Sequence, residues 1–315
     1  MRNATFSLLK GVGLDVGDDS LAGVAQSELR FGDGARYRIE IPSVEGPACL
    51  HAVLDAAQLW EVPVCRVSQG SGTYLLTDDE ITEMVEVAGA AGVEVSLFAR
   101  PCAGWDVSAS SRSPSGAAFA AATWGVSQLT AAVEEIQRVA ELGIRSVLIA
   151  DLGLLSVFGR LRTSGALPTD MQAKISVMLG PSNPASAQAL AALGADTINV
   201  APDLSIAEIA ALRRVVTVPL DVYIEAPDDL GGFVRYHELA DLIATAAPVY
   251  VKVGLRNAAA VYPTGTHLDT SVRAFAVERV RRARMALDLL ARSGLTERPS
   301  GVGAAGLAVP VRSNG

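Results

Sequence analysis

The chain has 315 residues, half of them hydrophobic, and a formal net charge of -8 at pH 7. This length allows a large buried core, in one barrel-sized domain or two smaller ones. The acidic charge argues against binding to nucleic acid, and no stretch approaches the ~20 consecutive apolar residues of a membrane helix. The N-terminal sequence lacks the apolar core and cleavage site of a secretory signal, so we expect a globular cytoplasmic protein without membrane contact.

Cysteine and lysine are both scarce. Cys49, Cys65 and Cys102 are too few and too scattered for a disulfide framework, a thiolate zinc site or a four-cysteine iron–sulfur cluster. We therefore expect reduced core thiols and no iron–sulfur cofactor. Only three of the 26 basic residues are lysines, which is typical of a GC-rich genome. A lysine retained inside a predicted strand, such as Lys252, is therefore a candidate for a specific role.

Eight short apolar runs are followed by turn residues and then by sequence typical of helices. They are Tyr37–Ser43, Val62–Ser68, Val93–Arg100, Ile144–Asp151, Lys174–Gly180, Asp196–Ala201, Pro219–Ala226 and Pro248–Leu255. Between them, helix starts are indicated by capping boxes at Thr77 with Glu80 and at Ser205 with Glu208. Strands that alternate with helices in this way predict βαβ units and a parallel sheet.

Eight such units predict a closed (β/α)₈ TIM barrel of the α/β class. An open doubly wound sheet is the alternative, but no GxGxxG fingerprint follows the first strand. We predict that residues 37–295 form the barrel. Residues 1–36 are expected to form an N-terminal extension that caps the barrel or contacts a partner, and residues 296–315 a flexible tail. Residues 101–126 contain an insertion after the third strand that is long enough to be a lid.

The strand Pro248–Leu255 has an unexpected alternation. Its aliphatic positions suit a contact with outer helices, and the alternate positions, which should face the barrel interior, hold Tyr250, Lys252 and, beyond the run, Arg256. The corresponding positions of the other strands are Arg38, Glu40, Arg66, Ser68, Ser96, Phe98, Arg100, Ser176, Met178, Thr197, Asn199, Asp221, Tyr223 and Glu225. The fourth strand is ambiguous, because Asp151 falls in register with Val147 and Ile149.

An interior so rich in charge requires ion pairs or a ligand, because an unpaired buried charge costs several kcal/mol. One interpretation is an internal network that only stabilises the barrel. The other is an active site, since barrel enzymes place their chemistry at the C-terminal ends of the strands. The catalytic candidates are Glu225, Lys252, Asp151 and Glu40. The candidates for substrate binding are Arg66, Arg100, Asn199, Tyr223, Arg256, Asn257, Gln69 and Ser182.

Arg66, Arg100 and Arg256 suit a bidentate grip on a carboxylate, so a carboxylate-bearing small molecule or short peptide is the expected substrate. Glu225 is the candidate general base. Lys252 either stabilises an anion as an ammonium group or, if desolvated and neutral, forms a Schiff base with a carbonyl substrate. We favour the charged role because acidic residues are predicted on the adjacent strand.

The metal content is unknown from the sequence. A divalent cation bound by Glu40, Asp151, Glu225 or Asp228 stays an open alternative, since hard cations prefer oxygen ligands. The three histidines, His51, His237 and His267, do not suggest a transition-metal site.

Two stretches carry a resemblance to a known family. IEIPSVEGPACLHAVLDAA and LGADTINVAPDLSIAEIAALRR resemble the opening strand and a later helix start of the collagenase-like U-32 peptidases, over roughly residues 37–257. The resemblance implies a barrel and peptidase activity. The family's most specific motif, His-Gly-Ala-Leu-Cys, would fall where Glu225, Ala226, Pro227 and Asp228 stand, so this chain is a divergent relative without the cysteine motif.

Three function classes follow. The first is a peptidase-like enzyme that acts on a carboxylate-bearing substrate by hydrolysis or related acid–base chemistry. The second is a Schiff-base lyase or aldolase built on Lys252. The third is a barrel without catalysis that works as a ligand-binding protein or as a subunit, and a homo-oligomer stays open.

Overall fold

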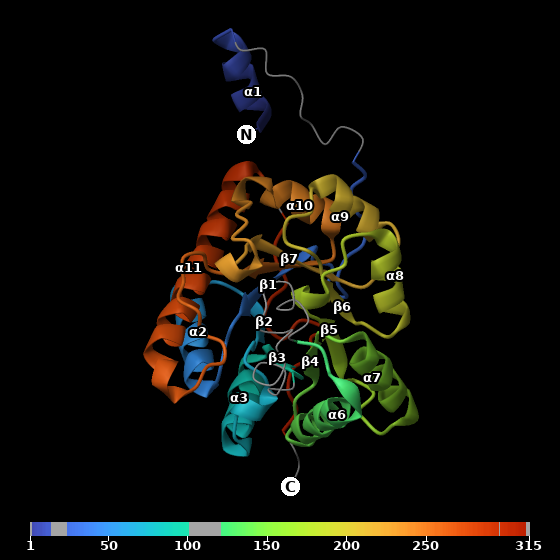
Figure 1. Cartoon of the computed structure of the whole chain (residues 1–315). Coiled ribbons are helices and arrows are strands. Elements are labelled where there is room, and N and C mark those ends of the chain that lie inside the picture. Colours follow the sequence, from blue (N-terminus) through green and yellow to red (C-terminus); the bar gives the residue numbers. More distant parts are fainter. Residues whose placement is uncertain (1, 14–23, 101–120, 296, 313–315) are drawn as a thin grey trace.

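Eight parallel strands form a closed barrel in the order β1 to β8, with β1 paired to β8 (Figure 1). The computed structural model describes residues 2–13, 24–100, 121–295 and 297–312. The strands are β1 (Tyr37–Pro42), β2 (Val64–Ser68), β3 (Glu94–Phe98), β4 (Ser146–Ile149), β5 (Gln172–Ile175), β6 (Thr197–Asn199), β7 (Leu220–Glu225) and β8 (Val249–Val253). The predicted (β/α)₈ barrel is confirmed. Most of the predicted lid, residues 101–120, lies outside the described residues.

Helices surround the barrel (Figure 1). They are α2 (Pro47–Leu59), α3 (Asp78–Ala91), α6 (Gly125–Glu141), α7 (Leu152–Ser164), α8 (Pro184–Ala192), α9 (Ile206–Arg213), α10 (Leu239–Ala246) and α11 (Asp269–Ser293), and α1 (Arg2–Gly11) precedes them. Short 3₁₀ turns follow strands at η1 (Thr73–Leu75), η3 (Val177–Leu179) and η4 (Asp228–Leu230), and η5 (Tyr236–Glu238) and η6 (Thr266–Leu268) precede α10 and α11.

Both predicted capping boxes are present. Thr77 Oγ1 accepts a hydrogen bond from the backbone N–H of Glu80, whose side chain accepts one from the Thr77 N–H in return, at the start of α3. Ser205 and Glu208 do the same at the start of α9. Each box satisfies backbone donors that a helix start leaves unpaired, which fixes where these helices begin.

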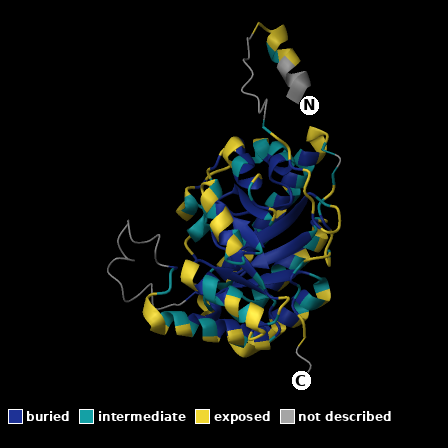
Figure 2. Ribbon diagram, turned by 90° about the vertical axis from the view of Figure 1, so that its right-hand side faces the viewer, coloured by how far each residue is buried: buried dark blue, intermediate teal, exposed yellow. Residues whose placement is uncertain are grey.

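The core lies between the strands and the helices. Figure 2 shows the strands buried throughout, while the helices are buried toward the strands and exposed on the other side. Aliphatic residues of alternate strand positions fill this layer, for example Ile39, Val67, Val147 and Val251. In β4 this places Val147 and Ile149 outward and Ser146 and Leu148 inward, which resolves the ambiguity of the sequence. No helix of the described residues is long and apolar enough to cross a membrane.

Residues 297–312 close the N-terminal end of the barrel. Their backbone forms hydrogen bonds with residues that precede or begin four strands, namely Tyr37, Gly92, Gly143 and, through its side chain, Gln172. Ser300 is 2% exposed and Ala308 5%. The sequence predicted a flexible tail here because Gly, Pro and Ser dominate. The described part is instead ordered by backbone hydrogen bonds that need no regular secondary structure.

Candidate functional site

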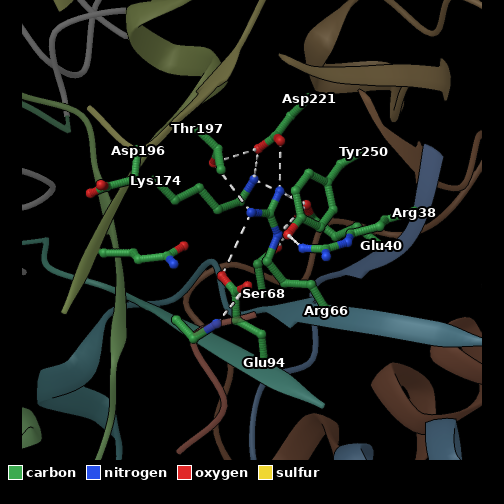
Figure 3. Close-up of polar contacts among 12 residues, drawn as sticks. Arg38, Glu40, Arg66, Ser68, Glu94, Lys174, Asp196, Thr197, Asp221 and Tyr250 are labelled. Atoms are coloured by element: carbon green, nitrogen blue, oxygen red, sulfur yellow. Dashed lines mark hydrogen bonds and ion pairs between the residues drawn. The ribbon is translucent and has the colours of Figure 1, made fainter. Parts of the chain in front are cut away.

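The middle of the barrel is filled by ion pairs rather than by branched apolar side chains (Figure 3). Arg66 donates two hydrogen bonds to Glu40, at 2.8 and 2.6 Å, and its guanidinium also lies 2.6 Å from Asp221 and 3.6 Å from Glu94. Lys174 pairs with Glu40 at 3.1 Å and with Asp221. All five side chains are at most 1% exposed.

Below this layer, Tyr250 lies between two guanidinium groups. The Arg66 guanidinium carbon is 3.5 Å from the centroid of the Tyr250 ring, and Arg38 donates to the Tyr250 hydroxyl at 3.1 Å. Arg38 also donates to Ser300 Oγ and to the carbonyl of Ala305, so neutral acceptors of the C-terminal segment surround its charge. This end of the barrel is closed, and the network there has a structural role.

The network holds Glu40 as an anion. Arg66, Lys174 and Lys252, together with the hydroxyl of Ser68, hold the Glu40 pKa well below its ordinary value, although burial opposes this. A carboxylate so fixed is a poor proton acceptor. Conversely, burial and the neighbouring charge of Arg66 lower the pKa of Lys174 to about 8.

Above the network, a cavity of about 620 Å³ opens at the C-terminal end of the barrel. Its charged or polar lining residues are Ser43, Ser68, Gln69, Arg100, Ser176, Asn199, Tyr223, Asp229, Lys252, Tyr262 and Arg279. Among the lining residues that the structure describes, the charged ones are three cations and one acid, Asp229. The lining therefore favours an anionic ligand.

Lys252 lies at the floor of this cavity and is 3% exposed. Its Nζ is 3.4 Å from Glu40 Oε1 and 4.3 Å from the centroid of the Tyr223 ring. With the Asn199 amide oriented to satisfy both neighbours, its oxygen accepts from Lys252 Nζ at 2.8 Å and its nitrogen donates to the Asp221 carbonyl at 3.1 Å. The acid that accompanies Lys252 is thus Glu40 on β1, whereas the sequence suggested Glu225 and Asp221 on β7.

Tyr223 supplies a hydroxyl to the same cavity. Burial, followed by the charge of Glu40, raises the pKa of Tyr223 above its ordinary value. Its hydroxyl therefore stays protonated and can donate a hydrogen bond to an anion.

Arg279 of α11 also reaches the cavity and is 4% exposed. Among the described residues, its Nε has no hydrogen-bond partner. The buried Glu45 accepts from the backbone N–H groups of Gly70 and Ser71 at 2.9 and 3.0 Å. Burial raises the pKa of Glu45, although these bonds and the charge of Arg279 oppose the shift. A buried guanidinium that lines a cavity is a ready anion-binding group.

Two further predicted residues line the cavity. Gln69 uses its amide to hold the following loop, since it donates to the carbonyl of Gly72 and accepts from its N–H. Arg100 is 8% exposed, and its guanidinium carbon lies 5.6 Å from the centroid of the Phe98 ring. The structure thus brings Gln69, Arg100, Asn199, Tyr223 and Lys252 together around one space.

Glu225 does not line the cavity. Its carboxylate accepts from the N–H of Arg256 at 2.9 Å, from the hydroxyl of Tyr236 at 2.7 Å and from Arg282 at 3.0 Å. The register between β7 and β8 shifts between Tyr223 and Glu225, which breaks the alternation on which its inward assignment depended. The geometry therefore gives no support to Glu225 as the base.

The turn beyond β8 is equally irregular. A Cβ at Gly254 would lie 2.4 Å from the carbonyl oxygen of Glu225, so only glycine permits this close approach of the two strand ends. Arg256 beyond it is directed to the surface, where its side chain is 54% exposed and pairs with Asp228 at 3.2 Å. The N–H of Asn257 donates to the same carboxylate. Neither Arg256 nor Asn257 lines the cavity.

The remaining predicted residues have local roles or lie apart. Asp151 caps α7, where it accepts from the N–H of Leu154 at 2.7 Å, and it also accepts from that of Thr123. Ser182 is exposed and does not line the cavity. Arg66 and Glu40 lie beneath the cavity in the buried network. The described residues contain no group of three histidine, cysteine or acidic side chains suited to a metal.

Three buried charged residues of the ion network and the cavity were not among the sequence candidates. Glu94 and Lys174 share the alternation of Ser96 and Ser176, so extending each inward set by two residues toward the start of its strand would have found them. Arg279 could have been found on α11, where it occupies one position of the buried stripe. The stripe, at spacings of four and three, is Val272, Ala276, Arg279, Ala283, Ala286 and Leu290.

Comparison with known proteins confirms the family resemblance. The sequence model of peptidase family U32 matches residues 121–226, which extend from the start of α6 to the end of β7. The match covers about a third of the chain. It ends before β8 and α11, so it does not include Lys252 or Arg279. No curated protein matches the chain.

Solved structures with this fold include three of different function. The U32 peptidase Mk0906 is 19% identical, with 61% of this chain and 70% of that chain covered and a TM-score of 0.39. The putative copper homeostasis protein CutC from Streptococcus agalactiae is 14% identical, with 68% and 98% covered and a TM-score of 0.45. A truncated 3-deoxy-D-arabino-heptulosonate 7-phosphate synthase from Thermotoga maritima is 17% identical, with 86% and 95% covered and a TM-score of 0.43.

Proposed function

Because residues 121–226 of this chain match peptidase family U32, we propose that the protein is a barrel enzyme that hydrolyses a short peptide or related carboxylate-bearing small molecule. The observation that carries the proposal is Arg279, a buried guanidinium that lines the same cavity as Lys252. A cavity of this size accommodates a ligand of dipeptide size. The substrate carboxylate binds the part of the Arg279 guanidinium that lines the cavity.

The cavity contains groups that can take part in hydrolysis. Asp229 is the single carboxylate among the described lining residues, and it replaces Glu225 as the candidate base. In the proposed step, Asp229 accepts a proton from water, the hydroxyl adds to the substrate carbonyl carbon, and the proton passes to the leaving nitrogen as the amide bond breaks. Lys252 and the Tyr223 hydroxyl stabilise the negative charge that develops on the carbonyl oxygen.

The first test is ligand binding, measured by thermal shift with short peptides and with their C-terminal amides. A ligand at a hundred times its dissociation constant adds about 2.7 kcal/mol, or several degrees in melting temperature. We expect stabilisation by free carboxylates, little by amides, and its loss in Arg279→Gln. Equal stabilisation of wild type and Arg279→Gln would contradict the proposed carboxylate site.

The second test is activity, measured as the release of free amine from a peptide panel. We expect Asp229→Asn to lower the rate about 10²-fold or more, as for loss of a general base. Asp228→Asn is the matched control, because its neighbouring carboxylate pairs with Arg256 outside the cavity. Peptide binding without hydrolysis would reject the reaction and leave a ligand-binding barrel.

A Schiff-base lyase is the second candidate, and one observation favours it. Lys252 is the single primary amine among the described lining residues and contacts Tyr223 and Asn199 in a buried setting. The amine would condense with a substrate ketone and release water. Against this, Glu40 at 3.4 Å stabilises the ammonium form. Borohydride reduction in the presence of pyruvate, followed by mass spectrometry, would detect an adduct in wild type that is absent from Lys252→Met.

A further inference from the structure

The cavity has two walls of opposite chemistry. One wall is apolar and consists of Phe98 at the end of β3, Leu148 of β4 and Met178 of η3. Phe98 and Leu148 belong to a separate buried cluster with Ala121 and Ala150, against which Met178 packs. This cluster is distinct from the core between strands and helices, so it belongs to the barrel interior.

The other wall is cationic and hydrogen-bonding. It is formed by Lys252 of β8, Tyr223 of β7 and Arg279 of α11. In a closed barrel of eight strands, three strands lie between β4 and β8 in either direction. Leu148 and Lys252 therefore face each other across the lumen, and a ligand that fills the cavity contacts both walls at once.

The apolar wall would oppose a small hydrophilic ligand. Covering the surface of Phe, Leu and Met side chains with an apolar group favours binding by about 25 cal/mol per Å² of apolar surface removed from water. A polar group does not provide this gain. Three such side chains on adjacent strands suit one aromatic ring or branched alkyl group. Arg100 borders this wall, with its guanidinium 5.6 Å from the centroid of the Phe98 ring.

From these two walls we infer that the ligand is amphipathic, a carboxylate whose carbon skeleton carries an aromatic or branched aliphatic group. The carboxylate binds Arg279, and the apolar group contacts Phe98, Leu148 and Met178. This inference rests on the proposed carboxylate site and adds the nature of the side chain. If the ligand is a peptide, we expect its C-terminal residue to be hydrophobic.

The test is calorimetric titration of the full chain with three probes, N-acetyl-L-phenylalanine, N-acetyl-L-aspartate and N-acetyl-L-phenylalaninamide. We expect the phenylalanine derivative to bind at least tenfold more tightly than the other two. Leu148→Ala should weaken its binding about tenfold, since roughly 1–2 kcal/mol of apolar contact is lost. Leu97→Ala is the control, because Leu97 is a fully buried leucine of the neighbouring strand β3 that packs in the core outside the cavity, and its loss should leave the affinity unchanged.

The outcomes distinguish a failure of this inference from a failure of the proposed carboxylate site on which it rests. The inference alone is overturned if N-acetyl-L-aspartate binds as tightly as N-acetyl-L-phenylalanine, or more tightly, and Arg279→Gln still abolishes this binding. If that tighter binding also disappears in Arg100→Gln, the wall of Phe98, Leu148 and Met178 binds an anion beside Arg100 rather than an apolar group. Equal binding of the amide, or no binding of any probe at millimolar concentration, overturns both the inference and the proposed function.

Discussion

At the scale of single residues, Lys174 shows how far burial can change the pKa of a side chain. Burial and Arg66 lower its pKa to about 8, while Asp221 and Glu40 oppose the shift. Below pH 8 the folded and the unfolded chain both hold the proton, so the cost of the buried charge is fully present. Between pH 8 and the ordinary pKa of 10.5, the unfolded chain binds more protons than the folded one. The contribution of Lys174 to stability therefore rises with pH in this window.

We predict that wild type gains stability relative to Lys174→Met between pH 7.5 and 9.5, by about 1–2 kcal/mol. The free energy of unfolding in urea, measured at both pH values for both proteins, checks this. The buried thiols of Cys49 and Cys65, whose pKa burial raises to about 11, titrate alike in the two proteins, and their effect cancels. The same pH dependence in both proteins would show that Lys174 keeps its proton throughout.

At the scale of elements, the C-terminal segment protects the thiol of Cys65. Cys65 Sγ lies 3.4 Å from the carbonyl oxygen of Ser300 and 3.5 Å from that of Gly301. Cys65 is fully buried, and burial raises its pKa, so both access and thiolate content are low. The segment is held by hydrogen bonds to strand ends rather than by a hydrophobic stripe, and such contacts open more readily than helices packed on the core.

We predict that truncation after Leu295 exposes Cys65 to a thiol reagent. In a Cys49→Ser and Cys102→Ser background, where Cys65 is the single thiol, the labelling rate should rise at least tenfold on truncation. Gly303→Val in the full chain is a second variant, because valine is strained at the left-handed φ of 68°. An unchanged rate in both variants would mean that other parts of the fold protect Cys65.

At the scale of the whole molecule, the ion network joins six of the eight strands. Glu40 of β1 and Arg66 of β2 connect Glu94 of β3 and Lys174 of β5 with Asp221 of β7 and Lys252 of β8. Three cations face three anions, so the network is close to neutral. Such a set stabilises only when complete, because removing one partner leaves uncompensated buried charge.

We predict that Glu40→Gln lowers the free energy of unfolding by roughly 3–5 kcal/mol, since Arg66, Lys174 and Lys252 share this carboxylate. Asp288→Asn is the control, because it removes an exposed ion pair with Arg284 and should change stability little. Urea denaturation checks both variants. A small effect of Glu40→Gln would mean that the amide and nearby water replace the carboxylate.

Local sequence determined the elements. Eight apolar runs, two capping boxes and the strand-helix alternation predicted the barrel, because these signals depend on neighbouring residues and on a period of two or 3.6. The same alternation also predicted an interior rich in charge, with Lys252, Asn199, Tyr223 and Arg100 directed inward, and Gln69 was a candidate from its place at a strand end. The family resemblance was likewise visible in the sequence.

Only the tertiary structure decided which charges meet. A register shift at the end of β7 directs Glu225 away from the cavity, and the turn after Gly254 does the same for Arg256. Arg279 reaches the cavity from α11, more than 20 residues after β8, and residues 297–312 return to the opposite end of the barrel. Contacts of this kind depend on the closure of the whole barrel, which places residues distant in sequence around one axis. No local pattern encodes that closure, so the sequence identified only some of the residues that meet, and the fold decided which of them share the cavity.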